Sequence, residues 1–426
     1  MNSASKAMLL QPVSRSGSSS HRSRVNAVLS ILLVFSIGYA LGLISNSTFQ
    51  NSYIPPFFLA PLLHPSSMPS SAPEKSPPPC KGLPTATDLF LSPSSGGGGS
   101  AMHNMTDEEL LWRASMAPPK ATHGRTPKRR VPKVAFLFLA KGELPLRPLW
   151  DKFFSGHDGL YSIYVHANPG HTAISPPPAD SVFHGRTIPS KNTSWGHPSL
   201  ADAERRLLAN ALLDISNERF ALLSESCIPI FDFPRIHAHL LSFSPSSGAG
   251  NGGMSFVDSI DDGISRARYN PAHAAHGVPI TVWRRGSQWF EMERSMALEV
   301  VSDEFLYPVV REQCYDPKYG GVPDEHYVPS LVSLLELSAR IANRSLTYLE
   351  WHAGTAHPWT HGPEKVTEEI FRKMRAGGEG GNCSFSGGDH GGLSGICFLF
   401  ARKFEGSALG KLLELAPKAM GFGSVI

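Results

Sequence analysis

The chain has 426 residues, of which 41% are hydrophobic and 18% charged, so it is long enough to bury a large core. Its formal net charge of +3 is too small for a dedicated nucleic-acid binder, and nucleic acid is not expected as a partner. Its five cysteines are scattered and form no C-x-x-C pair, which excludes a small disulfide-built scaffold and a zinc ribbon.

The first predicted element is a membrane-spanning helix at 25–44, VNAVLSILLVFSIGYALGLI, which holds no charged residue. At about 1.5 Å per residue it reaches about 30 Å, the thickness of a bilayer core. Basic residues precede it and none follows until Lys75, which predicts a cytosolic tail at 1–24 and a lumenal remainder. A cleaved signal peptide is the rival interpretation, but its apolar region is normally about 7–15 residues long.

Residues 45–130 are rich in Pro, Ser and Gly, a composition that favours extended or flexible backbone. We therefore predict a disordered stem. One short helix is expected inside it at 106–117, because Thr106 suits the N-cap position and three acidic residues follow. The folded domain is predicted to span 131–426.

Strands alternate with helices in the predicted folded domain. Strands are expected at 134–140, 161–166, 220–224 and 397–401. Helices are expected at 149–154, 199–214, 287–303 and 328–342. The first and third strands are continuous apolar runs, which is typical of parallel strands buried on both faces. The alternation predicts an α/β sheet covered by helices on both sides.

The segment PDEHY at 323–327 is expected in a turn just before a helix. Its carboxylates and imidazole could supply a general base, because a carboxylate is ionised at neutral pH and can accept a proton from a hydroxyl. On spacing alone, helix capping by Asp324 or Glu325 is the competing role.

The segment FARKF at 400–404 follows a predicted strand. Its adjacent cations, Arg402 and Lys403, could bind a diphosphate, with Arg making planar bidentate contacts and Lys acting as a point charge. A solvated basic turn is the alternative.

Aromatic and polar clusters give weaker signals. Exposed tryptophans stack on sugar rings, although burial is the commoner fate of the residue. The candidates are Trp195, Trp283, Trp289, Trp351, Trp359 and His357. An acidic and basic set, Asp258, Asp261, Asp262, Arg266 and Arg268, could form a binding loop or a surface ion-pair cluster. The His-x-His pair at 237–239 and the pair at 273 and 276 have no suitably spaced carboxylate or Cys, so a metal site is not expected.

The chain contains no D-x-D triplet, the usual metal–diphosphate ligand of one large glycosyltransferase class. The closest substitute is Glu291-Met292-Glu293, which lies in a helix-like stretch. In a sugar-nucleotide enzyme, basic side chains would then neutralise the leaving diphosphate, since any preorganised cation can stabilise developing negative charge.

Five segments together resemble the plant branch of the Core-2/I-branching β-1,6-N-acetylglucosaminyltransferase superfamily. They are SWGHPSLADAERRLLANAL, FALLSESCIPIFDFP, RRGSQWFEMERSMALEVVSD, PDEHYVPSLV and CFLFARKF, and the resemblance runs in order from about 134 to 413. It implies a GT-A-like, Rossmann-type domain and an inverting, metal-independent transfer from a UDP-sugar, with UDP-GlcNAc as the expected donor, to a glycoprotein or cell-wall glycan. It also implies a Golgi membrane protein of type II with a lumenal catalytic domain.

The resemblance also implies roles for single residues. Glu325 matches the family's catalytic base, and Lys403 matches the residue that binds the donor diphosphate, with Arg402 as a neighbour. Trp351 matches an aromatic residue that stacks on the acceptor, and Asp258 and Arg268 lie where acceptor contacts are expected. Residues 140–143 would border the uridine.

The chain departs from the family pattern in two places. Gly320-Gly321-Val322-Pro323 replaces the Cys that plant members commonly carry before the DEH motif. The stretch 377–392 is unusually rich in Gly, and Cys383 and Cys397 could close a short loop by a disulfide in an oxidising lumen. A catalytically silent sugar-binding scaffold is the alternative function. A hydrolase would need two cooperating carboxylates about 5–10 Å apart, which adjacency of Asp324 and Glu325 does not provide.

Overall fold

A computed structural model of the chain describes residues 100–119, 131–171, 175–244, 253–313, 316, 318–355, 357–377 and 396–422. The chain divides into two compact units, Met1–Pro79 and Cys80–Ile426, and every described residue belongs to the second. Among these residues, no helix is both long enough and apolar enough to cross a membrane. The predicted anchor at 25–44 and most of the predicted stem lie outside the described residues.

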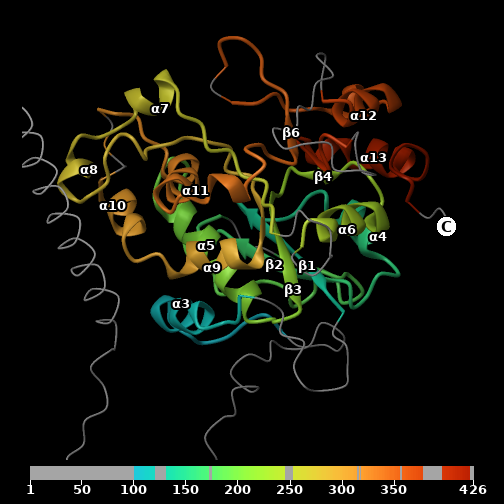
Figure 1. Ribbon diagram of the computed structural model, residues 1–426. Coiled ribbons are helices and arrows are strands. Elements are labelled where there is room, and N and C mark those ends of the chain that lie inside the picture. Colours follow the sequence, from blue (N-terminus) through green and yellow to red (C-terminus); the bar gives the residue numbers. More distant parts are fainter. Residues whose placement is uncertain are drawn as a thin grey trace, which may run out of the picture. The chain divides into compact units, whose positions relative to one another are not determined.

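A four-stranded sheet runs through the centre of the domain (Figure 1). Its order is β2-β1-β3-β5, formed by Tyr161–Ala167, Lys133–Ala140, Asn217–Ser224 and Glu291–Glu293. The first three strands are parallel, and β5 pairs antiparallel with β3. The predicted strands at 134–140, 161–166 and 220–224 are confirmed.

Both faces of β1 are buried. Successive side chains of a strand point to opposite sides, and here residues 135, 137 and 139 enter one hydrophobic core while 134, 136 and 138 enter the other. The double burial explains why VAFLFLA is apolar throughout instead of alternating with polar residues.

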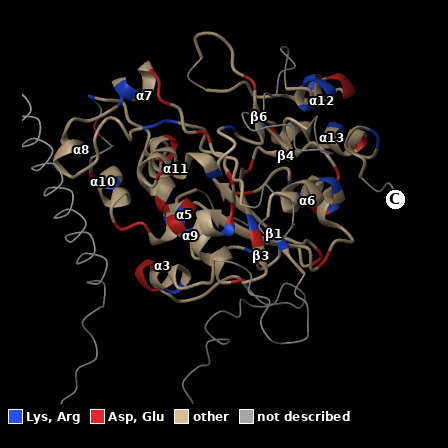
Figure 2. Ribbon diagram, in the orientation of Figure 1, with Lys and Arg blue, Asp and Glu red and all other residues tan. Residues whose placement is uncertain are grey.

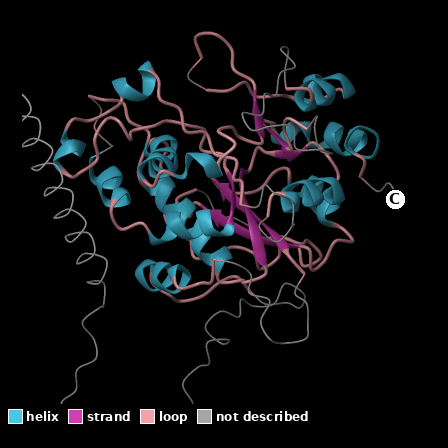
Figure 3. Cartoon of the chain, viewed as in Figure 1, coloured by secondary structure: helices cyan, strands magenta, loops and turns pink. Residues whose placement is uncertain are grey.

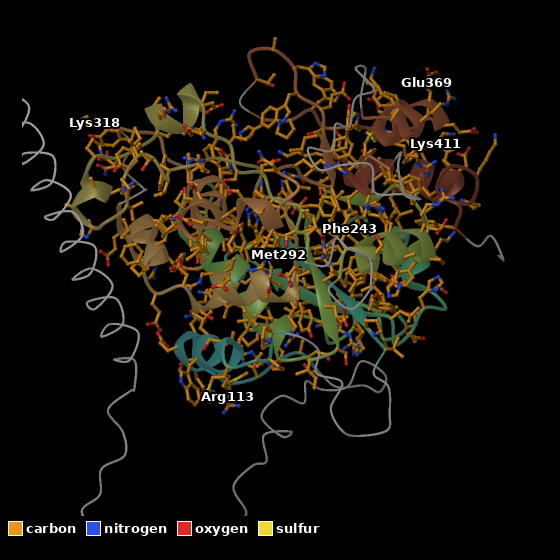
Figure 4. The ribbon with its side chains drawn as sticks, in the orientation of Figure 1. Arg113, Phe243, Met292, Lys318, Glu369 and Lys411 are labelled. Atoms are coloured by element: carbon orange, nitrogen blue, oxygen red, sulfur yellow. The ribbon has the colours of Figure 1, made fainter. Side chains whose placement is uncertain are left out.

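Helices cover both faces of this sheet (Figures 1 and 3). The core of one face takes side chains from α3 (Asp107–Ser115), α5 (Ser199–Leu212), α9 (Arg294–Ser302), α10 (Leu306–Gln313) and α11 (Pro323–Leu334). The core of the other takes them from α4 (Arg147–Phe154), α6 (Phe233–Ser242), α12 (Glu368–Arg375) and α13 (Leu409–Leu415). Met292 of β5 is fully buried at the centre (Figure 4). The predicted mixed α/β domain is confirmed.

A second, smaller sheet has the order β4-β7-β6, formed by Ile228–Pro229, Phe400–Arg402 and Thr347–Leu349. The strand β7 is antiparallel to β4 and parallel to β6, and Arg402 pairs in register with Leu349. This sheet therefore fixes the place where the chain leaves β7 and continues into Lys403.

Two helix predictions need correction. The first half of the helix predicted at 287–303 is extended chain and the strand β5, and α9 starts only at Arg294. The Glu293 side chain accepts a hydrogen bond from the backbone N–H of Met296 and so caps α9, while Glu291 forms a buried ion pair with Arg219 of β3. Two buried polar contacts thus override the helical pattern.

The helix predicted at 328–342 is α11, which starts at Pro323, so PDEHY forms its first turn and does not precede it.

The helix predicted at 106–117 forms as α3 and is packed, although it lies within the predicted stem. Thr106 caps it by accepting a hydrogen bond from the N–H of Glu109. Its residues Leu110 and Ala114 are buried in the core of the sheet, and Asp107 pairs with Arg206 of α5 at 2.8 Å. This part of the stem segment therefore belongs to the folded domain.

Candidate functional site

The first turn of α11 places three ionisable side chains in three different environments. Asp324 and His326 are buried, whereas the Glu325 side chain keeps 37% of its surface exposed. Val322 occupies the N-cap position of α11, so neither Asp324 nor Glu325 is its N-cap residue. An acidic residue in the first turn is still favoured by the partial positive charge of the helix N-terminus.

Glu325 is held from two directions. Nη1 of Arg268 donates to its Oε2 at 2.8 Å, and the backbone N–H of Gly286 donates to its carbonyl oxygen at 2.9 Å. Arg268 lies directly after the short helix α7 (Gly263–Ala267), whose start is fixed by a capping box of Asp262 and Ser265. The fold therefore gives a carboxylate that is oriented and still reachable from solvent.

Asp258 lies on the other side of the Gly286 segment. Its Oδ2 accepts a hydrogen bond from the backbone N–H of Ser287 at 3.1 Å, and burial raises its pKa above the ordinary value. A Cβ at position 286 would lie 2.4 Å from the Asp258 carbonyl oxygen, so only glycine permits this approach. The structure thus brings Asp258, Arg268 and Glu325 to the same segment around Gly286.

Acidic and basic residues lie close together around α7 (Figure 2). Asp261 pairs with Arg266 at 2.8 Å, and Asp262 pairs with Arg285 at 2.7 Å. The predicted acidic and basic set is therefore divided: these ion pairs stabilise the loop, and Arg268 reaches Glu325.

Behind Glu325 lies a pair of buried acids. Burial, and next the charge of Glu325, raise the pKa of Asp324 to about 7. Burial, and next the charge of Asp324, raise the pKa of Glu204 of α5 well above its ordinary value. Glu204 Oε1 accepts a hydrogen bond from Nε2 of Gln288 at 2.8 Å. Asp324 is therefore buried and only partly ionised at neutral pH, whereas Glu325 is exposed, so Glu325 is the carboxylate of PDEHY suited to accept a proton from an acceptor.

His326 is a structural residue. Its ring stacks on Trp283 with centroids 4.7 Å apart, and its Nδ1 lies 2.7 Å from the Arg284 carbonyl oxygen. Burial lowers its pKa to about 4, which keeps the imidazole neutral at physiological pH. We therefore exclude it as the exposed base of this helix.

Lys403 and its neighbours form a cationic site after β7. Burial, and then the charges of Arg402 and Lys141, lower the pKa of Lys403, while Glu225 opposes the shift. Lys141 follows β1 and Glu225 follows β3. Within the described residues, no acidic group lies within 4 Å of Lys403 or Lys141 in an ion pair. Crowded cations of this kind favour an anionic ligand.

The cations lie at the switch point of the main sheet. The chain passes from β1 to β2 on one side and then to β3 on the other side of β1. In open α/β sheets, ligands bind outside the carboxyl ends of the strands at such a point. Lys141 and Glu225 follow the two strands that flank it, so the charges around Lys403 occupy the expected ligand position.

Arg402 differs from Lys403. Its guanidinium lies over the ring of buried Trp289, 4.2 Å from the centroid, and burial lowers its pKa. The segment 286–289 therefore connects the two parts of the site: Gly286 contacts Glu325, and Trp289 contacts Arg402. Because an extended chain spans at most about 3.6 Å per residue, the two ends of this short segment cannot lie far apart.

The candidate tryptophans fall into two groups. Trp283 and Trp289 are buried, whereas Trp195, Trp351 and Trp359 are 68%, 56% and 44% exposed. Trp351 therefore has the exposure that an acceptor-stacking residue needs. No group of three or more metal-ligating side chains occurs within the described ranges.

Sequence reasoning missed several contributors. Lys141 lies within the stretch 140–143 that was expected to border the uridine, but its charge was not singled out. Glu225 follows a predicted strand, a position that could have marked it. Glu204 gave no signal, and Trp289 was singled out only as a candidate for stacking on sugar, because the contacts of these residues with Asp324 and Arg402 join parts that are far apart in the chain. Cys397 is disulfide-bonded, while its predicted partner Cys383 lies outside the described residues.

Two comparisons with known proteins found similar sequences. The family model "Branch: Core-2/I-Branching enzyme" matches residues 134–375. The rice protein "Glycosyltransferase BC10" (Oryza sativa subsp. japonica) is 32% identical over 319 residues, which cover 67% of this chain and 76% of that protein. The region matched by the family model includes Glu325, Arg268 and Trp351 and ends before Lys403.

Proposed function

Because the chain belongs to the Core-2/I-branching enzyme family and is a glycosyltransferase, we propose that it transfers a sugar from a UDP-sugar to a hydroxyl of a glycan or glycoprotein. We propose GlcNAc as the transferred sugar, inversion at the anomeric carbon, and no need for a metal ion. The observation that carries the proposal is an exposed, oriented carboxylate, Glu325, connected through the segment 286–289 to a cluster of cations at a sheet switch point.

Glu325 is the proposed catalytic base. It takes the proton of the acceptor hydroxyl as the oxygen attacks the anomeric carbon and forms the new glycosidic bond. The bond between that carbon and the diphosphate oxygen breaks on the opposite face, and UDP leaves with the electron pair. Arg268, 2.8 Å from Glu325, holds the carboxylate in its orientation.

Lys403 is the proposed diphosphate ligand, with Lys141 beside it. The leaving diphosphate gains negative charge in the transition state, and fixed cations stabilise that charge in place of a metal ion. Arg402 is less suited to contact the donor because its guanidinium lies on Trp289. We propose that it positions Lys403 and adds positive potential from behind.

Trp351, Asp258 and Arg268 are the proposed acceptor ligands. An exposed indole offers a flat face to the C–H groups of a sugar ring, and the two charged residues offer hydrogen bonds to hydroxyls. Arg268 can serve both the acceptor and Glu325, because a guanidinium has five N–H donors.

We also propose a Golgi location with the type II topology indicated by the 25–44 segment and the basic residues before it. Protease treatment of intact microsomes checks the orientation. The proposal predicts that the catalytic domain is protected until detergent is added. Digestion of that domain in sealed vesicles would contradict the topology.

Transfer activity tests the function. The full-length protein is incubated with a panel of UDP-sugars and glycan acceptors, with and without EDTA, and UDP release and product are measured. We expect product with UDP-GlcNAc, unchanged by EDTA, and a loss of activity in Glu325→Gln. Donor binding without turnover across the panel would instead support a silent sugar-binding scaffold. Activity that disappears with EDTA would overturn metal independence alone.

A further inference from the structure

A loop of exposed aromatic side chains borders the cationic site. The loop starts at Glu350 after β6 and is closed by a hydrogen bond from the Trp359 N–H to the Glu350 carbonyl oxygen at 2.7 Å. Between these ends, Trp351, His352 and His357 are exposed, as is Trp359 itself. Large exposed indoles in such a short segment lose favourable burial unless a ligand covers them.

The aromatic rings of this loop contact one another and a second loop. The His352 ring stacks on Trp359, with centroids 4.7 Å apart and planes 14° apart. The Trp195 ring meets His357 edge to face at 5.3 Å. Trp195 comes from the segment before α5, where the Thr193 carbonyl oxygen accepts a hydrogen bond from Asn168 just after β2. Two loops from different sheets therefore bring aromatic rings together. We define the aromatic platform as the two ring pairs, Trp195 with His357 and His352 with Trp359, together with the exposed Trp351 next to His352 in the chain.

The composition of the loop favours a carbohydrate over a protein as its ligand. Residues 350–361, EWHAGTAHPWTH, contain no Val, Leu, Ile or Met. A protein interface would normally combine aromatic anchors with other large apolar groups. Aromatic faces interspersed with Glu, His and Thr instead match a sugar, whose ring has apolar C–H faces and polar edges. The negative face of an indole attracts the slightly positive C–H groups.

The platform is continuous with the proposed diphosphate site. The backbone N–H of Lys403 lies 3.5 Å from the Trp359 carbonyl oxygen, and the Lys403 carbonyl oxygen accepts a hydrogen bond from His361 at 2.8 Å. A glycan lying on the platform would therefore extend to the residue that holds the donor. No such continuity exists for Trp112, which is 61% exposed on α3 and lies far from β6 (Figure 1).

We propose that the platform is an extended acceptor subsite, which binds sugar units beyond the one that carries the reacting hydroxyl. The acceptor is therefore an oligosaccharide of several units, and Trp195 and His357 contact a unit separate from the one on Trp351. This inference rests on the proposed transferase function and adds the size class of the acceptor to it.

Calorimetric binding to the full-length protein tests the platform without requiring turnover. The probes are oligosaccharides of one to six units, built from β-linked glucose, galactose, xylose or N-acetylglucosamine, and UDP as a separate ligand. For at least one series, affinity is expected to rise from one unit to three or more. Trp195→Ala should lower the affinity of the longer members about 3- to 10-fold, while Trp195→Phe retains most of it. Trp112→Ala is the matched control for loss of an exposed tryptophan and should have no effect.

The outcomes separate this inference from the proposed function. Transfer activity with equal affinity for all chain lengths would overturn the platform and leave the function intact. Length-dependent binding that Trp195→Ala weakens, without any transfer, would support the platform and contradict the transferase. If Trp195→Ala weakens UDP but not the oligosaccharides, Trp195 belongs to the donor site and the inference is wrong. Absence of binding by every oligosaccharide also overturns it.

Discussion

The two charged regions of the site differ in how their charges are compensated. Around Glu325, each strong charge has a partner: Arg268 pairs with Glu325, and Asp262 pairs with Arg285. Around Lys403, cations crowd together, and the pKa of the lysine falls through burial and through Arg402 and Lys141. The charges of the first region are compensated before any ligand binds, whereas those of the second region are compensated only when an anionic ligand binds.

This difference matches the chemistry of each half of the reaction. A base must be ionised and oriented before the acceptor arrives, and a paired carboxylate meets that need. The residues that bind the diphosphate must be stabilised when the donor arrives. Cations that repel one another are stabilised most by the arrival of an anion. Where like charges are left together in a folded chain, the missing counter-charge indicates the ligand.

The largest expected effect comes from removing the base. Glu325→Gln keeps the shape and loses the proton acceptor, so we expect kcat to fall by about 10²–10⁴-fold, the usual contribution of general base catalysis. Donor affinity should change little, because the diphosphate lies in the other region. Steady-state kinetics and UDP titration separate the two quantities.

The matched control for this substitution is Glu369→Gln, an exposed glutamate on α12 (Figure 4). It should leave kcat unchanged. A Glu325→Gln enzyme with full kcat on a verified acceptor would remove Glu325 from the mechanism and end the distinction between the two regions.

Removing the Lys403 cation should weaken binding of the donor. A hydrogen bond to a charged group contributes about 1.5–3 kcal/mol, so Lys403→Ala should raise the UDP dissociation constant about 10- to 150-fold. Lys411→Ala is the control, since Lys411 is an exposed residue of α13 paired with Glu414 at 2.8 Å (Figure 4). Isothermal titration with UDP measures both. Equal affinities for the two variants would mean that the crowded cations do not bind the donor.

The sheet was predictable from the sequence because its strands are buried on both faces. VAFLFLA and FALLS are apolar throughout, and only double-sided burial requires that pattern over such lengths. The helix predicted at 287–303 was partly wrong, because Glu291 pairs with buried Arg219 and Glu293 caps the start of α9. No local sequence pattern reveals these partners.

The candidate site was predictable only in part. The positions of Glu325 and Lys403 followed from an ordered set of segments, and the structure places the predicted Asp258 and Arg268 around Gly286. The exposure of Glu325 against the burial of Asp324 and His326 was not predictable, because it depends on which face of α11 meets α5. Arg402 was paired with Lys403 by adjacency, although Trp289 gives it a different environment.

The buried acids predict a pH-dependent stability in the region of the base. The pKa of Asp324 is raised to about 7, so the folded state binds its proton more tightly than the unfolded state, where the pKa is about 3.9. This stabilisation is complete below the unfolded pKa and is lost as the pH rises through about 7. Between pH 5.5 and pH 8.5, the free energy of unfolding of the wild type should therefore fall by about 1–4 kcal/mol relative to that of Asp324→Asn. Denaturant unfolding at both pH values measures this, and parallel pH dependence of the two proteins would contradict it.

The smallest expected effect is an alkaline loss of donor affinity. The pKa of Lys403 lies below that of an ordinary lysine, so its charge begins to disappear at a lower pH than the usual value of about 10.4. UDP itself is fully ionised above pH 7.5, because the second phosphate pKa is about 6. Affinity for UDP should therefore fall between pH 7.5 and pH 9.5 in wild type, because the lowered pKa brings the loss of the charge towards this range. In Lys403→Arg the charge persists, so titration over the same range should give a flatter curve. If the Arg variant loses affinity as steeply as wild type, the titrating group is elsewhere and the crowding around Lys403 does not control the donor site.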